Sequence, residues 1–169
     1  MGIIKQADAS FKVHGRRKYQ AINRDGFMVD LIMPHSKGDP ILSKPQIGRI
    51  GTTEEDLDAI EIGGLAWLVS TPAFESVVIG EDGYPVRMVS PDPRAWAIHK
   101  LWLSDRPDRD PLKKRRDRMQ GLLIVDLLSK RRPDMPFDDD RALSALPASL
   151  RERILKRDVP GEEDLSPGW

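Results

Sequence analysis

Alternating apolar and polar positions in the first half of the chain predict short antiparallel strands. Residues 18–22 and 27–33 alternate in this way on either side of residues 23–26, an Asn-Arg-Asp-Gly turn. Glycine suits the turn position that needs a positive φ, so these two segments are expected to form a β-hairpin. The same pattern marks three further segments as strands: residues 57–62, 76–79 and 85–89. The last two are expected to form a second hairpin.

Residues 35–56 interrupt this pattern. They are rich in Gly, Pro, Ser and Thr and are expected to form a long loop.

The second half of the chain carries the signals of helices. Asp92-Pro93 and Asp110-Pro111 each place a capping aspartate before a proline at the first helical position. A stripe of apolar residues at helical spacing follows each start and is expected to be buried. The two stripes are Ala95, Ile98, Leu101 and Trp102, and then Met119, Leu122, Leu123 and Leu127.

The second helix is expected to end near Pro133 and Pro136, and residues 141–157 to form one or two short helices broken at Pro147. The whole pattern predicts an α+β fold, with a small, mainly antiparallel sheet followed by a helical bundle. We expect three regions: a sheet-containing part, a helical part and a flexible tail, over residues 1–92, 93–158 and 159–169.

Composition narrows the classes of function. The chain of 169 residues has no cysteine, which excludes disulfides, zinc knuckles and a thiol nucleophile. No apolar run approaches the roughly 20 residues of a membrane span, and the first residues lack the pattern of a secretory signal. We therefore expect no membrane association and a cytoplasmic location.

The net charge of zero conceals a basic block. Residues 94–132 contain 12 basic and 5 acidic side chains, a local charge of +7. Such a block suits a polyanion, for example a nucleotide, a nucleic acid or an acidic protein face. The competing interpretation is a solvated helix face that binds nothing.

Asp30 is the first candidate for chemistry. It lies in an apolar strand, on the same face as Met28 and Ile32, where a carboxylate needs a cation, a metal or hydrogen-bond donors. Strand-borne carboxylates also build Mg²⁺ sites. The alternative is an edge strand whose Asp30 faces water or an arginine.

Lys100 and Asp117 are candidates on the helices. Lys100, beside His99 in a mostly apolar helix, suits a triphosphate, although its stem could equally lie on the core with its head in water. Asp117 follows Lys113 and Lys114 at ion-pair spacing, which explains it without a functional role. His99 is a possible general base, or a structural histidine beside a buried stripe.

The connection between the two helices is charged. Arg106 and Arg109 lie in the string Arg-Pro-Asp-Arg-Asp, which could hold phosphates or could simply form a solvated turn.

The order of these features resembles a known family. Residues 83–101 run from a hairpin through a proline turn into a helix with His-Lys-Leu, and Arg116-Asp117-Arg118 follows on the next helix. With the strand over residues 23–34, they resemble a bacterial family of nucleotidyltransferase-fold proteins. That family is similar in turn to the nucleotidyltransferase toxins of abortive-infection systems. The resemblance covers about residues 5–132 and makes the first region a remnant of a nucleotidyltransferase domain.

The resemblance implies roles for individual residues. Asp30 would be the third catalytic carboxylate and a ligand of Mg²⁺, Lys100 would contact phosphate and Asp117 would be the helical acid. Arg106, Arg109 and Arg116 would help Lys100 to bind the nucleotide. The family's Gly-Ser turn and Asp-x-Asp pair do not occur before Asp30, and one aspartate cannot hold Mg²⁺ against its water shell.

Two hypotheses of function follow. The first is the C-terminal portion of a nucleotidyltransferase-like protein, which transfers a nucleotide from an NTP to RNA or protein when the front motif is supplied. The isolated chain would then be a fragment, a shortened product, or a subunit that needs a partner chain or a homodimer. The second hypothesis is a non-catalytic module that binds nucleic acid or protein through the basic block.

Overall fold

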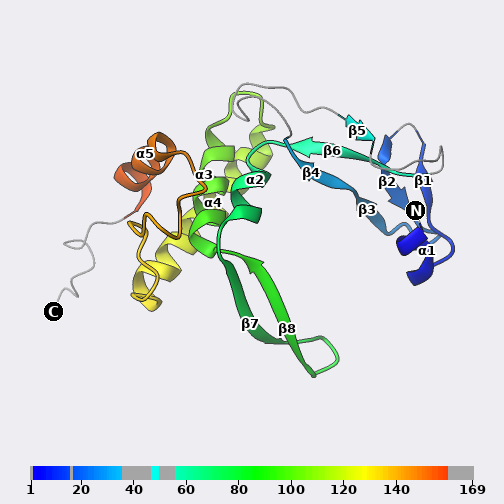
Figure 1. The fold of residues 1–169 in the computed structure, drawn as a ribbon, viewed down its shortest axis with the longest axis horizontal. Helices are drawn as coiled ribbons and strands as arrows, with labels where there is room; N and C mark the ends of the chain where they lie inside the picture. The colour runs from blue at the N-terminus through cyan, green and yellow to red at the C-terminus, as the bar shows by residue number, and fades with distance from the viewer. Residues whose placement is uncertain (1, 16, 36–46, 50–55, 160–169) are drawn as a thin grey trace. The chain divides into compact units, whose positions relative to one another are not determined.

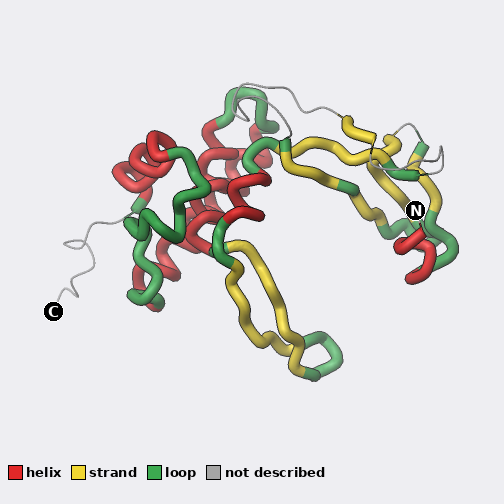
Figure 2. The backbone as a smooth tube through the Cα atoms, in the orientation of Figure 1, coloured by secondary structure: helices red, strands yellow, loops and turns green. Residues whose placement is uncertain are grey.

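A computed structural model describes residues 2–15, 17–35, 47–49 and 56–159. The chain forms two compact units, residues 1–66 and 67–169. Each unit is described by itself (Figures 1 and 2). Short strands in the first unit and a β-hairpin followed by helices in the second confirm the predicted α+β fold.

The first unit contains a helix and two three-stranded sheets. Helix α1 precedes sheet β1-β2-β3, in which all neighbours are antiparallel, and sheet β4-β6-β5 follows. In the second sheet β4 runs parallel to β6, and β5 runs antiparallel to it. The elements are α1 (Gly2–Ala7), β1 (Lys12–His14), β2 (Arg17–Ile22), β3 (Met28–Asp30), β4 (Ile32–Pro34), β5 (Ile47–Arg49) and β6 (Asp58–Ile62).

The first predicted hairpin is present, with one correction. Gly26 occupies its turn with a φ of 82°, and β2 and β3 pair on either side. The predicted second strand over residues 27–33 is interrupted at Leu31. The Leu31 amide donates to Tyr19 O on β2 at 2.7 Å, and the Leu31 carbonyl accepts from the Ile60 amide on β6 at 3.0 Å. The backbone therefore changes from one sheet to the other at this residue.

The predicted long loop over residues 35–56 is partly a strand. Residues 47–49 form β5, which pairs with β6, whereas residues 36–46 and 50–55 lie outside the described part of the chain. A small core of Phe11, Ala21 and Leu57 holds the first sheet together.

The second unit is a helical bundle with one long hairpin. Strands β7 and β8 form the second predicted hairpin, and β8 leads directly into α3 (Figure 1). Helices α3 and α4 pack side by side, and α5 packs against α3. The elements are α2 (Leu65–Ser70), β7 (Ala73–Ile79), β8 (Pro85–Pro91), α3 (Pro93–Asp105), α4 (Pro111–Arg131) and α5 (Ala148–Asp158).

Helix α3 is the centre of this unit's core. Its predicted stripe is confirmed, because Ala95, Ile98 and Leu101 have no exposed surface and Trp102 is almost fully buried. Residues of the later segments are also buried in this unit, including Leu143, Leu146, Leu150 and Ile154. Pro147 precedes α5, as predicted, and residues 141–146 form turns.

The predicted buried stripe of α4 is wrong. Met119, Leu123 and Leu127 are exposed and Leu122 is half-buried, whereas the buried residues are Asp117, Gly121, Val125 and Leu128. The physical reason is Gly121, which lets α4 approach α3 closely. A Cβ atom at this position would lie 2.7 Å from Leu101 Cγ and 3.1 Å from the Ala97 carbonyl oxygen. The face of α4 that contains Gly121 therefore packs against α3, and the face with Met119 and Leu123 stays exposed.

None of the helices in the described part of the chain combines the length and the apolar character that a membrane crossing requires.

Candidate functional site

Two aspartate caps fix the ends of the helices that carry the candidate residues. The Asp92 carboxylate accepts a hydrogen bond from the Arg94 amide, and the Asp110 carboxylate accepts from the Leu112 and Lys113 amides. Such caps satisfy amides that have no partner inside the helix. Both helix starts are therefore where the sequence predicts them, and the connection from Arg106 to Asp110 is short and defined at each end.

Asp117 is the centre of a charge cluster between α3 and α4. It has no exposed surface. Lys100 Nζ on α3 donates to Asp117 Oδ1 at 2.9 Å. Arg109 in the connection donates its Nε and a terminal nitrogen to Asp117 Oδ2, at 2.8 Å and 2.7 Å. One buried carboxylate thus fixes two cations, one on α3 and one in the connection between α3 and α4.

The cluster keeps its charge despite burial. Burial alone raises the pKa of the Asp117 carboxyl, but the hydrogen bonds and charges of Lys100 and Arg109 outweigh it, and the pKa is lowered below its ordinary value. Asp117 is therefore ionised at neutral pH. Since it has two cationic partners, the cluster has a net charge of +1.

The two cations remain accessible. The Lys100 side chain is 17% exposed and that of Arg109 is 28% exposed. The Lys100 ammonium also lies 5.2 Å from the centre of the Trp96 ring, a cation–π distance. Lys100 is thus positioned by a carboxylate and an aromatic ring, while part of its surface faces solvent.

Arg106 lies on the same connection. Its guanidinium forms two hydrogen bonds with the Asp108 carboxylate, at 2.9 Å and 2.7 Å, and stacks 5.0 Å from the centre of the Trp102 ring. These hydrogen bonds raise the pKa of Arg106 and lower that of Asp108. The charge of Arg106 is therefore neutralised by Asp108, whereas the cluster at Asp117 has one cation more than it has acids.

The structure separates Arg116 from this cluster. Arg116 is exposed and lines a groove along α4 together with Leu112 and Met119.

His99 is buried and packs between aromatic rings, with its ring centre 5.5 Å from that of Trp102 and 6.3 Å from that of Trp67. These two ring contacts are typical of a histidine packed in a core.

Asp30 belongs to the first unit. It is exposed at the end of β3, where Gln20 Nε2 donates to its Oδ1 at 2.6 Å. Within the described residues, no three His, Cys, Asp or Glu side chains gather closely enough to hold a metal ion. One carboxylate that already accepts an amide does not make a Mg²⁺ site, which needs several oxygen ligands. The described residues therefore do not fit a magnesium ion by themselves.

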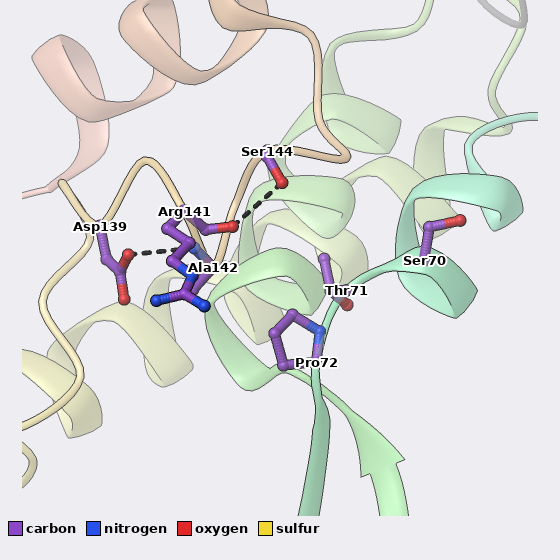
Figure 3. A pocket seen from close by; sticks show the side chains of 7 residues that line it. All are labelled: Ser70, Thr71, Pro72, Asp139, Arg141, Ala142 and Ser144. Atoms are coloured by element: carbon purple, nitrogen blue, oxygen red, sulfur yellow. Dashed lines mark hydrogen bonds between the residues drawn. The ribbon is translucent and has the colours of Figure 1, made fainter.

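A polar pocket of about 570 Å³ lies elsewhere in the second unit, between residues 70–72 and the turns after α4. Figure 3 shows Asp139 accepting from the Ala142 amide and the Ser144 hydroxyl donating to the Arg141 carbonyl. A second Asp139 oxygen pairs with Arg94 at 3.2 Å. These polar groups mainly hold the turn together, and none of the predicted site residues lines this pocket.

The pairing of Asp117 with Lys100 and Arg109 is the part of the site that sequence patterns miss. The spacing pointed to Lys113 and Lys114 instead. A usable signal exists, because Asp117, Gly121, Val125 and Leu128 recur at intervals of four, four and three and mark the inner face of α4. An aspartate on that face needs cationic partners from another element.

The family model described as Nucleotidyltransferase matches residues 1–145, most of the chain. No curated protein and no solved structure matches the chain.

Proposed function

The chain belongs to the nucleotidyltransferase family, and from this membership we propose that its second unit binds the triphosphate of an NTP. Lys100 and Arg109 are the contacting cations, and Asp117 positions them. Transfer of the nucleotide to an RNA or protein acceptor then needs further carboxylates, supplied by another segment or a partner chain.

The observation that carries this proposal is the cluster at Asp117. A fully buried carboxylate lies on α4, with both oxygens bound by cations from α3 and from the connection. A purely structural ion pair needs only one cation, and apolar residues of similar size are often at least as stabilising as a buried pair. The extra cation leaves a fixed positive charge at partly exposed groups, which suits phosphate oxygens.

No step proposed here passes through a metal ion held by this chain. The residues present bind, orient and neutralise phosphate. Lys100 supplies a compact charge and Arg109 supplies a planar group with further donors, since the Arg109 terminal nitrogens have more hydrogens than Asp117 accepts.

The second candidate function, a nucleic-acid-binding module, is favoured by a different observation. Lys113 and Arg115 on the first turns of α4 are exposed and Lys114 is half-buried. They form a basic patch apart from the buried carboxylate. Binding through such a patch is sequence-independent and weakens steeply with salt, because each neutralised phosphate releases a counterion.

A titration of variants separates the two functions. Calorimetric titration of the chain with ATP and with single-stranded RNA is carried out at two salt concentrations. In a nucleotide site, Lys100→Ala and Arg109→Ala each weaken ATP binding by about tenfold or more, equal to about 1.4 kcal/mol. The matched control Lys156→Ala, an exposed lysine on α5, leaves the affinity unchanged.

The opposite pattern would support the module. Simultaneous replacement of Lys113, Lys114 and Arg115 by Ala would then lower RNA affinity and flatten its salt dependence, while Lys100→Ala would have no effect. A chain that binds neither ligand would contradict both functions.

A further inference from the structure

Helix α4 has an apolar outward face that nothing in the described part of the second unit covers. Leu112, Met119 and Leu123 are 83%, 62% and 66% exposed, and they lie within about 40° of one another around the helix at 100° per residue. A groove of about 680 Å³ follows this face. Three large apolar side chains in line on a helix are unusual on a free surface and mark a contact site.

The charges beside this face are ordered along the helix. Arg115 and Arg116 flank its N-terminal end and line the same groove. Asp126 lies at its C-terminal end, 57% exposed and paired to Lys130 of the same helix at 2.6 Å. At 100° per residue Asp126 lies to one side of the centre of the face, on the same side as Arg115. One end of the face is therefore basic, and the other end has a carboxylate at its edge.

We propose that this face joins two copies of the chain, with the α4 helices antiparallel about a two-fold axis at the level of residue 121. In that arrangement Met119 of each copy faces Leu123 of the other. Arg115 of each copy lies beside Asp126 of the other, because the two-fold axis brings the same edge of the two helices together. Leu112 faces the aliphatic stem of Lys130. The face is self-complementary, as a two-fold interface requires.

The alternatives fit the charge pattern less well. A parallel pair places Arg115 and Arg116 beside their own copies, so like charges meet. Nucleic acid has no need for Leu112, Met119 and Leu123 in the middle of its contact. The antiparallel pair uses the apolar centre and both charged ends, and it does not depend on the nucleotide site proposed above.

Sedimentation velocity of the full chain over a range of concentrations tests the interface. The parent chain is expected to dimerise, and Leu123→Glu to be monomeric. Because dimerisation itself stabilises the folded chain, the melting temperature of the variant is expected to equal that of the parent at a concentration where the parent is monomeric. The matched control is Val77→Glu, because Val77 is 68% exposed on the β7–β8 hairpin; this variant is expected to dimerise like the parent.

A charge exchange tests the register. Arg115→Asp and Asp126→Arg are each expected to weaken dimerisation by about tenfold or more, and the double variant to restore it. The two residues are eleven positions apart, about 16 Å along one helix, so they cannot pair within a single copy. Restoration therefore reports a contact between copies.

Three results would overturn the proposal. The first is a parent chain that stays monomeric. A monomer that binds RNA or an acidic peptide through this face would count as the same result. The second is a melting temperature of Leu123→Glu below that of the parent diluted to the monomer, which would mean that the chain itself buries the face. The third is a double variant that dimerises no better than the single ones.

Discussion

At Asp117 a carboxylate without exposed surface stays ionised because Lys100 and Arg109 donate hydrogen bonds to both of its oxygens. Each participant depends on the other two. Removal of the carboxylate leaves two cations close together, and removal of either cation leaves a buried charge with fewer donors. The cluster therefore links local stability to the charge that the proposed function needs.

Acid should weaken this cluster. The pKa of Asp117 is lower in the folded chain than its ordinary value of about 3.9, so the carboxylate stabilises the fold above that value. The stabilisation is lost as pH falls through the lowered pKa. Asp117→Asn should cost about 1–3 kcal/mol at neutral pH, and the difference from the parent should shrink below about pH 4.

Urea unfolding of both proteins over a pH series measures this difference. The variant is the necessary reference, because hydrogen bonds also lower the pKa of other acids, such as Asp108 and Asp139. A difference that stays constant to the lowest pH would mean that the Asp117 charge does not stabilise the fold.

The sequence identifies the residues of the cluster as candidates, but it does not show which of them contact one another. Lys100, Arg109 and Asp117 were named as candidates, from the resemblance and from a charged string. Lys100 and Asp117 are 17 positions apart and meet only because α3 and α4 pack together. Local spacing contains no information on such a contact, and so it favoured the neighbouring lysines.

At the scale of elements, helix ends were easier to predict than helix faces. The starts at Pro93 and Pro111 depend on a capping aspartate and a proline, which act within a few residues. The inner face of α4 depends on its partner. Because α4 has apolar residues on two faces, periodicity alone selected Met119 and Leu123, and the small residue Gly121 decided the outcome.

Gly121→Leu should force α3 and α4 apart. A Cβ atom already meets Leu101 Cγ at 2.7 Å, so the longer side chain should lower the free energy of unfolding by about 1–3 kcal/mol. Arg131→Leu, at an exposed position on the same helix, should change it by less than about 0.5 kcal/mol. Urea denaturation measures both, and equal stability of the two variants would contradict the close approach.

At the scale of the whole molecule, the order of strands and helices was predictable because hairpin turns and helix caps depend on residues that are close together in the sequence. The split of the first unit into two sheets was not, because it depends on Leu31 bonding to both β2 and β6, the latter almost 30 residues further along the chain. A continuous run of strand residues does not show where the backbone changes its partner.

The chain by itself should not transfer nucleotides. No Gly-Ser turn with an Asp-x-Asp pair precedes Asp30 in the sequence, and a metal-dependent transfer site needs several carboxylates to hold its cation. Incubation with each of the four labelled NTPs and Mg²⁺ or Mn²⁺ should give no labelled product. Label that is incorporated by the parent and lost in Asp30→Ala would contradict this prediction and reveal further carboxylates.

The β7–β8 hairpin has a consequence for aggregation. Among the described strands these two pair only with each other, so each has one edge whose amides and carbonyls are free to template another strand. Val77, Ile79 and Met88 are exposed on this hairpin, which adds to the risk. Proline at both ends of β8, Pro85 and Pro91, removes amide donors from the ladder. These prolines act as gatekeepers, and their replacement should favour fibril-like assembly at high concentration.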